Sequence, residues 1–334
     1  MAKQTINIGG AANDGTGTTL RDSFDIVNDN FTELYAGDST ALNYKVEGSN
    51  FTGSLIIGHN TTGTLSSAIE NTAVGLQALE SITSGATNVA IGHEALSSGT
   101  ADTDNVAVGY QAMGNSNNAR AAVAIGFGAL KSLSYGSLTY THNVAVGFQS
   151  GKDVTSGNYN AFVGGQSGFS ITTGFGNVAI GYQALYSEDA HGTNIAVGYQ
   201  ALRNQDAGAH AYNVAIGYTT GINISTGAAN TIIGGNAGNN LTSGANNTVV
   251  GYQALSTENA HGKNVAIGKE ALKTLDAGQD GFNVAVGFEA GKLMTTGVSN
   301  NIIGALAGDA LTTANNHVAI GVSSLSAETE GNKN

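Results

Sequence analysis

The sequence predicts an all-β repeat protein, a parallel β-roll or β-solenoid, on three observations. The motif Asn-Val-Ala-Ile/Val-Gly recurs along the chain at a nearly constant interval, and every fourth interval is slightly longer. Glycine makes up 49 of the 334 residues, whereas proline, cysteine and tryptophan are absent. Only 11% of the residues are charged. A unit of about 17 residues is too short for a helical hairpin and suits one rung of two short strands and two turns.

The repeats predict about sixteen rungs over residues 55–325, with a polar tail at 326–334. Stacked ~4.8 Å apart, they would build a shaft about 70 Å long. Ordering one rung costs about 25 kcal/mol, while burying three or four aliphatic side chains returns only about 5 to 10 kcal/mol. Stacking and lateral association must therefore supply the rest. The glycines that mark the rungs are Gly58, Gly75, Gly92, Gly109, Gly126, Gly147, Gly164, Gly181, Gly198, Gly217, Gly234, Gly251, Gly268, Gly287, Gly304 and Gly321.

Strand alternation within a motif sends Val89 and Ile91 to one face and Ala90 to the other. We expect the two larger side chains to face the interior, with Leu96 entering from a second strand. Alanine would then face outward, where its small side chain lets another wall approach. The glycine that follows, Gly92, is expected to take a positive φ and turn the corner.

Asparagine begins thirteen of the fifteen clear motifs, the exceptions being Ala122 and His317. Because equivalent residues of stacked rungs lie above one another, these asparagines are expected to form a structural ladder of side-chain hydrogen bonds.

A longer period of four rungs lies on top of the first. Flanking sequences match from one period to the next, as between the segments that start at Gly181 and Gly251. Within a period, rungs come in two types that alternate in pairs. After the glycine, one type reads x-x-Ala-Leu, as at Ala95-Leu96, and the other reads x-x-Ala-Gly with an aliphatic residue further on, as at Ala237-Gly238 before Leu241.

The lengthened intervals place longer loops at 131–142, 203–212 and 273–282. We expect these loops to protrude from the shaft and to contact a receptor or a partner. Alternatively, their rings only cover the ends of the loops. The candidate contact residues are Tyr135, Tyr140, Tyr212 and Phe282.

Residues 1–37 differ from the repeats, and 38–54 form a linker. A helix is expected at about 19–36, because its apolar residues are spaced 4, 3, 4, 3 like those of a coiled coil. Such a helix would join parallel chains in register, or it would pack on its own chain as a short amphipathic helix. The expected oligomerisation residues are Leu20, Phe24, Val27, Phe31 and Leu34.

Composition argues against several function classes. A net charge of −12 with 12 Lys and Arg disfavours nucleic-acid binding, and no apolar run is long enough for a membrane span. Glu188 with His191 is repeated as Glu258 with His261 in the next period, but nothing fixes a further ligand, so no metal and no cofactor are expected. Glu188 with Asp189 is a weak candidate for a hydrolase pair. We therefore expect no enzyme.

The repeats Asn-Val-Ala-Ile-Gly-x-x-Ala-Leu, over roughly residues 55–325, resemble the head repeats of trimeric autotransporter adhesins. The resemblance implies a left-handed parallel β-roll assembled as a homotrimer. A cell-surface trimeric adhesin is accordingly one alternative function.

The segments Ile6-Asn7-Ile8-Gly9, Ala12–Gly17, Leu20-Arg21-Asp22 and Asn30–Tyr35 are similar to the start of many tailed-phage fibre and baseplate-associated proteins. That resemblance implies a structural subunit of a tail fibre or spike, attached by its N-terminus to other tail or baseplate proteins of the virion. It would be made in the host cytoplasm, since the opening residues lack a secretory signal, and would adhere to host glycan or protein. A carbohydrate-degrading tailspike is a further alternative.

Overall fold

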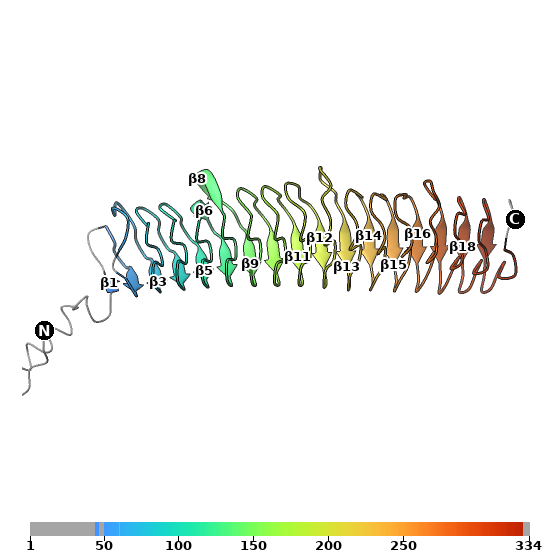
Figure 1. Ribbon diagram of the computed structural model, residues 1–334, viewed down its shortest axis with the longest axis horizontal. Coiled ribbons are helices and arrows are strands. Elements are labelled where there is room, and N and C mark those ends of the chain that lie inside the picture. The colour runs from blue at the N-terminus through green and yellow to red at the C-terminus, as the bar shows by residue number, and fades with distance from the viewer. Residues whose placement is uncertain (1–43, 47–49, 60, 330–334) are drawn as a thin grey trace, which may run out of the picture.

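The rod-shaped body of the protein is seen in a computed structural model that describes residues 44–46, 50–59 and 61–329 (Figure 1). One sheet of seventeen strands runs along the rod, and a second sheet of two strands, β6 and β8, stands apart from it. The expected attachment segment, with Leu20, Phe24, Val27, Phe31 and Leu34, lies outside the described residues. The strands are β1 Tyr44–Val46, β2 Leu55–Ile57, β3 Thr72–Val74, β4 Val89–Ile91, β5 Val106–Val108, β6 Asn117–Arg120, β7 Val123–Ile125, β8 Ser134–Tyr140, β9 Val144–Val146, β10 Ala161–Val163, β11 Val178–Ile180, β12 Ile195–Val197, β13 Val214–Ile216, β14 Thr231–Ile233, β15 Thr248–Val250, β16 Val265–Ile267, β17 Val284–Val286, β18 Asn301–Ile303 and β19 Val318–Ile320.

The main sheet confirms a parallel β-solenoid. Each rung contributes one three-residue strand, and equivalent residues of successive rungs pair directly, as Ala179 of β11 pairs with Ala196 of β12. Only β1 runs antiparallel, along β2, so the described sheet contains sixteen parallel rungs. β1 covers the edge that β2 would otherwise leave open, which removes a template for further strand pairing.

The side chains of the strands face the opposite way from our expectation. In β4 the interior side chain is Ala90, which is fully buried, whereas Ile91 is 39% exposed and Val89 is half-buried. The same pattern holds in the other parallel rungs that the structure describes, where the middle residue is buried. The prediction that valine and isoleucine fill the core was therefore wrong. Most rungs instead place alanine at the buried strand position, which leaves room for the leucine of the opposite wall, although Val249 and Leu255 are buried together in one rung.

That opposite wall is also not the second strand that we expected. After the rung glycine the chain forms a tight turn in which two alternate residues adopt left-handed backbone conformations, such as Glu94 (φ 55°) and Leu96 (φ 50°). Positive φ is uncommon for leucine and costs roughly 1 kcal/mol or more. Hydrogen bonds between rungs offset this conformational cost, because Leu96 N donates to Ala112 O at 2.9 Å. The left-handed backbone also places the Leu96 side chain in the core, where it is completely buried.

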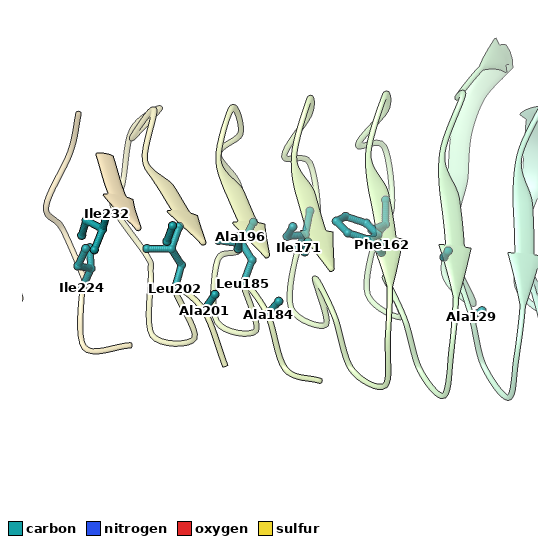
Figure 2. Packing of buried hydrophobic residues seen from close by; sticks show 14 of the residues in the cluster. Ala129, Phe162, Ile171, Ala184, Leu185, Ala196, Ala201, Leu202, Ile224 and Ile232 are labelled. Atoms are coloured by element: carbon teal, nitrogen blue, oxygen red, sulfur yellow. The ribbon is translucent and has the colours of Figure 1, made fainter. Parts of the chain in front are cut away.

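The two rung types are two ways of filling one core. In the second type glycine replaces the left-handed leucine, as at Gly151 and Gly168, and a large strand residue takes the vacated space. A Cβ at these glycines would lie 2.7 and 2.5 Å from the ring of Phe162, which is buried between them. The aliphatic residue further on, here Ile171, completes the wall, and Figure 2 shows it beside Phe162 and Leu185. Ile232 and Ile302 repeat the arrangement one and two periods later.

The rung glycines are required for two reasons. The sixteen of them have φ between 111° and 146°, which confirms the expected positive φ. They also lie directly against one another, because a Cβ on Gly234 would come within 2.6 Å of Gly251 O. A side chain at this column would push the rungs apart.

The asparagine ladder is present and fully buried. Asn230 Nδ2 donates to Gly244 O (2.9 Å) and to Asn213 Oδ1 (3.2 Å), while its own Oδ1 accepts from the backbone N and the Nδ2 of Asn247 (both 3.0 Å). The Asn230 amide therefore joins three rungs. Ala122 interrupts the ladder, although its backbone N still donates to Asn105 Oδ1 at 2.9 Å.

Replacing one member of the ladder should destabilise the rod. In Asn230→Ala, the Asn247 amide and the Gly244 carbonyl lose partners in a buried site, so we expect the free energy of unfolding to fall by about 3 kcal/mol. Asn240→Ala is the control, because Asn240 is exposed on the turn wall and should change stability by less than about 0.5 kcal/mol. Thermal and urea unfolding would measure both, and equal effects would contradict a structural role for the ladder.

Candidate interaction surface

The outer face of the main sheet carries a continuous aliphatic stripe. The third residue of each described parallel strand is valine or isoleucine, and none of these side chains is buried. A sheet face that meets water normally carries polar residues. We call these residues the outer stripe: Ile57, Val74, Ile91, Val108, Ile125, Val146, Val163, Ile180, Val197, Ile216, Ile233, Val250, Ile267, Val286, Ile303 and Ile320.

Two short stacks of rings border the stripe, each ring two positions after the stripe residue of its rung. Tyr110, Phe127 and Phe148 stack with centroids 5.0 and 5.2 Å apart, and Tyr182, Tyr199 and Tyr218 stack at 5.6 and 5.2 Å. All six rings are at least 40% exposed. The apolar surface is therefore wider than the stripe alone.

The first of the expected loops, 131–142, contains regular structure. Within it β8 pairs in parallel with β6 of the preceding rung, and the pair projects from the rod in Figure 1. The guanidinium of Arg120, on β6, lies 4.3 Å from the centre of the Tyr140 ring and 2.7 Å from Asp104. Tyr140 stacks in turn on His142, with centroids 5.6 Å apart, and remains 50% exposed.

Tyr135, on the same strand, is placed differently. Its ring is buried and its hydroxyl donates to Gly157 O at 2.7 Å, one rung further on. Burial raises the pKa of Tyr135 to about 12. Its side chain fastens β8 to the rod and is not available to a partner.

The other two loops are irregular and leave their candidate rings exposed. Loop 203–212 lies between β12 and β13, and loop 273–282 between β16 and β17 (Figure 1). Tyr212 is 61% exposed and Phe282 is 56% exposed, with the Lys263 ammonium 5.0 Å from the Phe282 ring centre. Tyr140, Tyr212 and Phe282 thus remain candidates for contact, on three separate loops that the structure does not bring together.

The candidate hydrolase pair does not form a dyad on one face. Glu188 is completely buried, whereas its neighbour Asp189 is exposed. Burial raises the pKa of Glu188 to about 7, and the charges of Asp206 and Asp189 add to the effect. The two carboxylates therefore do not share a groove in which a sugar could lie between them.

A third buried carboxylate, Asp102, was not singled out from the sequence. Its Oδ1 accepts from Ala119 N at 2.6 Å, and its Oδ2 has no hydrogen-bond partner among the described residues. Burial raises the pKa of Asp102 to about 6, against the opposing effect of its hydrogen bonds. Nothing in the local sequence distinguishes Asp102 from the exposed Asp104, so only the fold identifies it.

Searches for similar proteins return nothing for this chain: no family model, no curated protein and no solved structure matches it. Within the part of the chain that the structure describes, no helix has the length and apolarity needed to cross a membrane.

Asp102 should make stability depend on pH. Burial raises the pKa of Asp102 from its ordinary value of about 4 to about 6, so its contribution to stability is complete below pH 4 and is lost as pH rises through 6. A shift of about two units corresponds to about 3 kcal/mol. In Asp102→Asn the decline between pH 4 and 6 should become smaller by about 3 kcal/mol, and the remainder should come from Glu188 and Glu258, whose pKa values burial also raises; unfolding at pH 4, 5, 6 and 7 measures both.

Asp104→Asn is the matched control for that series. Hydrogen bonds from Thr87 and Arg120 hold the pKa of Asp104 below its usual value, so removing this carboxyl should leave the decline between pH 4 and 6 in place. A decline of the same size in Asp102→Asn would show that other groups cause it.

Proposed function

We propose that this chain is a structural subunit of a homotrimeric phage-type tail fibre or spike rather than an enzyme. Its N-terminal segment would attach it to other proteins of the virion, and its rigid shaft would project toward the host surface. The outer stripe is the observation that carries the proposal. The sequence resemblance of segments within residues 6–35 to phage fibre and baseplate-associated proteins supports the attachment end.

The outer stripe is too large for a solvated face. Even at roughly 50 Å² of exposed apolar area for each side chain, its sixteen residues present about 800 Å². The largest apolar patch of a typical monomer is about 300–600 Å², and a stable interface covers about 800 Å² on each partner. The stripe therefore has the area that one protein interface requires.

A second copy of the same chain is the occupant that fits it. The stripe is straight and repeats once per rung, at the ~4.8 Å spacing of stacked strands. Another chain in the same register offers the same side chains at the same spacing over the whole length, so valine and isoleucine can interdigitate along the rod. Three such sheets would enclose a common apolar centre, with the turn walls and long loops outside.

The oligomeric state tests the proposal. The native mass of the purified chain should be three times 33.5 kDa. The double variant Ile180→Glu with Ile216→Glu places charges in the middle of the stripe, and we expect its mass to fall to that of one chain, with the far-UV circular dichroism unchanged. Leu293→Glu is the control, because Leu293 is 49% exposed but lies on the turn wall.

A monomeric wild-type chain would contradict the trimer. A trimer that survives in the double variant would show that the outer stripe is not the interface.

The exposed loop rings support adhesion as the role of the shaft. Tyr140, Tyr212 and Phe282 lie on separate loops, and flat aromatic rings stack well on the apolar faces of sugars. Replacing all three by serine should weaken binding to a panel of bacterial surface polysaccharides at least tenfold, since a buried aromatic contact is worth about 2 kcal/mol.

Leu138→Ser is the control for that triple variant, because Leu138 is 46% exposed on β8, close to Tyr140 in sequence but without a ring. Unchanged binding by the triple variant, with the trimer intact, would refute a contact role for these rings.

A further inference from the structure

Two rungs bury a carboxylate where most other rungs carry an apolar side chain. Beyond the tight turn that follows the rung glycine, the wall sends a side chain into the core, as Ile171 and Leu241 do. At this position two other rungs have Glu188 and Glu258, both fully buried.

A buried carboxylate is costly unless partners compensate it. Glu258 accepts hydrogen bonds from His261 N and Ala277 N, both at 3.2 Å. Glu188 accepts one from His191 N at 3.2 Å.

The second of these glutamates lies in a cluster of three metal-ligand types. Glu258, His261 and Asp276 each offer one ligand atom, and these atoms lie within 4.8 Å of one another. His261 Nδ1 is 3.4 Å from Glu258 Oε1 but has no hydrogen-bond partner among the described residues. This ring nitrogen therefore lies beside the carboxylates without making a hydrogen bond to either of them.

The first glutamate has the same neighbours one period earlier. Glu188 Oε1 lies 3.7 Å from His191 Nδ1, and Asp206 is close enough for its charge to affect Glu188. Glu188 Oε2 is buried and has no hydrogen-bond partner in the described part of the chain, and the same is true of His191 Nδ1. An unpartnered oxygen on a fully buried carboxylate is an independent sign that a ligand belongs there.

We propose that Glu258, His261 and Asp276 bind a divalent transition-metal ion of the Zn²⁺ type, and that Glu188, His191 and Asp206 bind a second one. One imidazole nitrogen with two carboxylate oxygens is a ligand set that Zn²⁺ accepts, with water completing the coordination. Ca²⁺ fits less well, because it takes six to eight oxygen ligands.

The proximity of a third ligand could not be predicted from the sequence. Glu-x-x-His fixes only two ligands on one turn, and for that reason we expected no metal. Asp276 belongs to the next rung, at the start of its lengthened loop, and stacking brings it to within 4.8 Å of the pair. Asp206 occupies the equivalent position 70 residues earlier. A bound ion would fasten loops 203–212 and 273–282 to the preceding rung.

Metal titration of the full chain tests the proposal. After dialysis against a chelator, calorimetric titration with ZnCl₂ should show about two ions per chain, with a dissociation constant on the order of 1 μM. Glu188→Gln and Glu258→Gln should each remove one ion, and the variant with both changes should bind none. His93→Asn is the control, because His93 pairs with Glu94 at 3.9 Å on the surface and belongs to no cluster of three among the described residues; it should still bind two.

Absence of saturable binding by the wild-type chain would overturn the proposal, and so would two ions bound by the variant with both glutamates replaced. Loss of one ion with Glu258→Gln but none with Glu188→Gln would keep the second site and refute the first. Asp206→Asn and Asp276→Asn, at the loops, repeat the test if a core variant fails to fold. Native mass measured on the same samples keeps this result separate from the trimer, because neither site includes an outer-stripe residue.

Discussion

Register between rungs depends on the buried asparagine ladder. A short strand of a repetitive sequence can slip by one or two residues against its neighbours, which moves equivalent residues out of alignment. The ladder opposes slippage because each buried amide needs partners on the rungs before and after it, as Asn230 has in Asn213 and Asn247. With register held, the rung glycines meet one another, and the roll can be as narrow as it is.

The small cross-section of the roll then determines that the outer face of the main sheet is apolar. Leucine from the turn wall and alanine from the sheet fill about half of the rungs, and the strands turn most of their valine and isoleucine outward. A single chain thus has a packed core and an exposed apolar face. In this respect the rod resembles one half of a sandwich, whose sheets need a second apolar face to pack on.

The sequence was sufficient for the repeat, the parallel sheet, the glycine corners and the asparagine ladder, because each follows from spacing and backbone geometry. It was not sufficient for the direction of the strand side chains. Period two separates Ala90 from Val89 and Ile91 but does not say which side is inside, and size suggested the wrong answer. Asp276 could not be linked to Glu258 either, since their proximity depends on how a lengthened loop folds over the preceding turn.

From Gly147 onward, packing around Phe162, Ile232 and Ile302 makes four rungs, not one, the repeating unit of the core. Each large side chain occupies space that two successive glycine turns leave open, and the next two rungs restore leucine. Deleting a single rung would set a bulky residue against leucine or leave a hole. Duplicating a whole period keeps every neighbour in place. Over evolution, or in design, such a shaft should therefore grow or shrink in steps of about 19 Å.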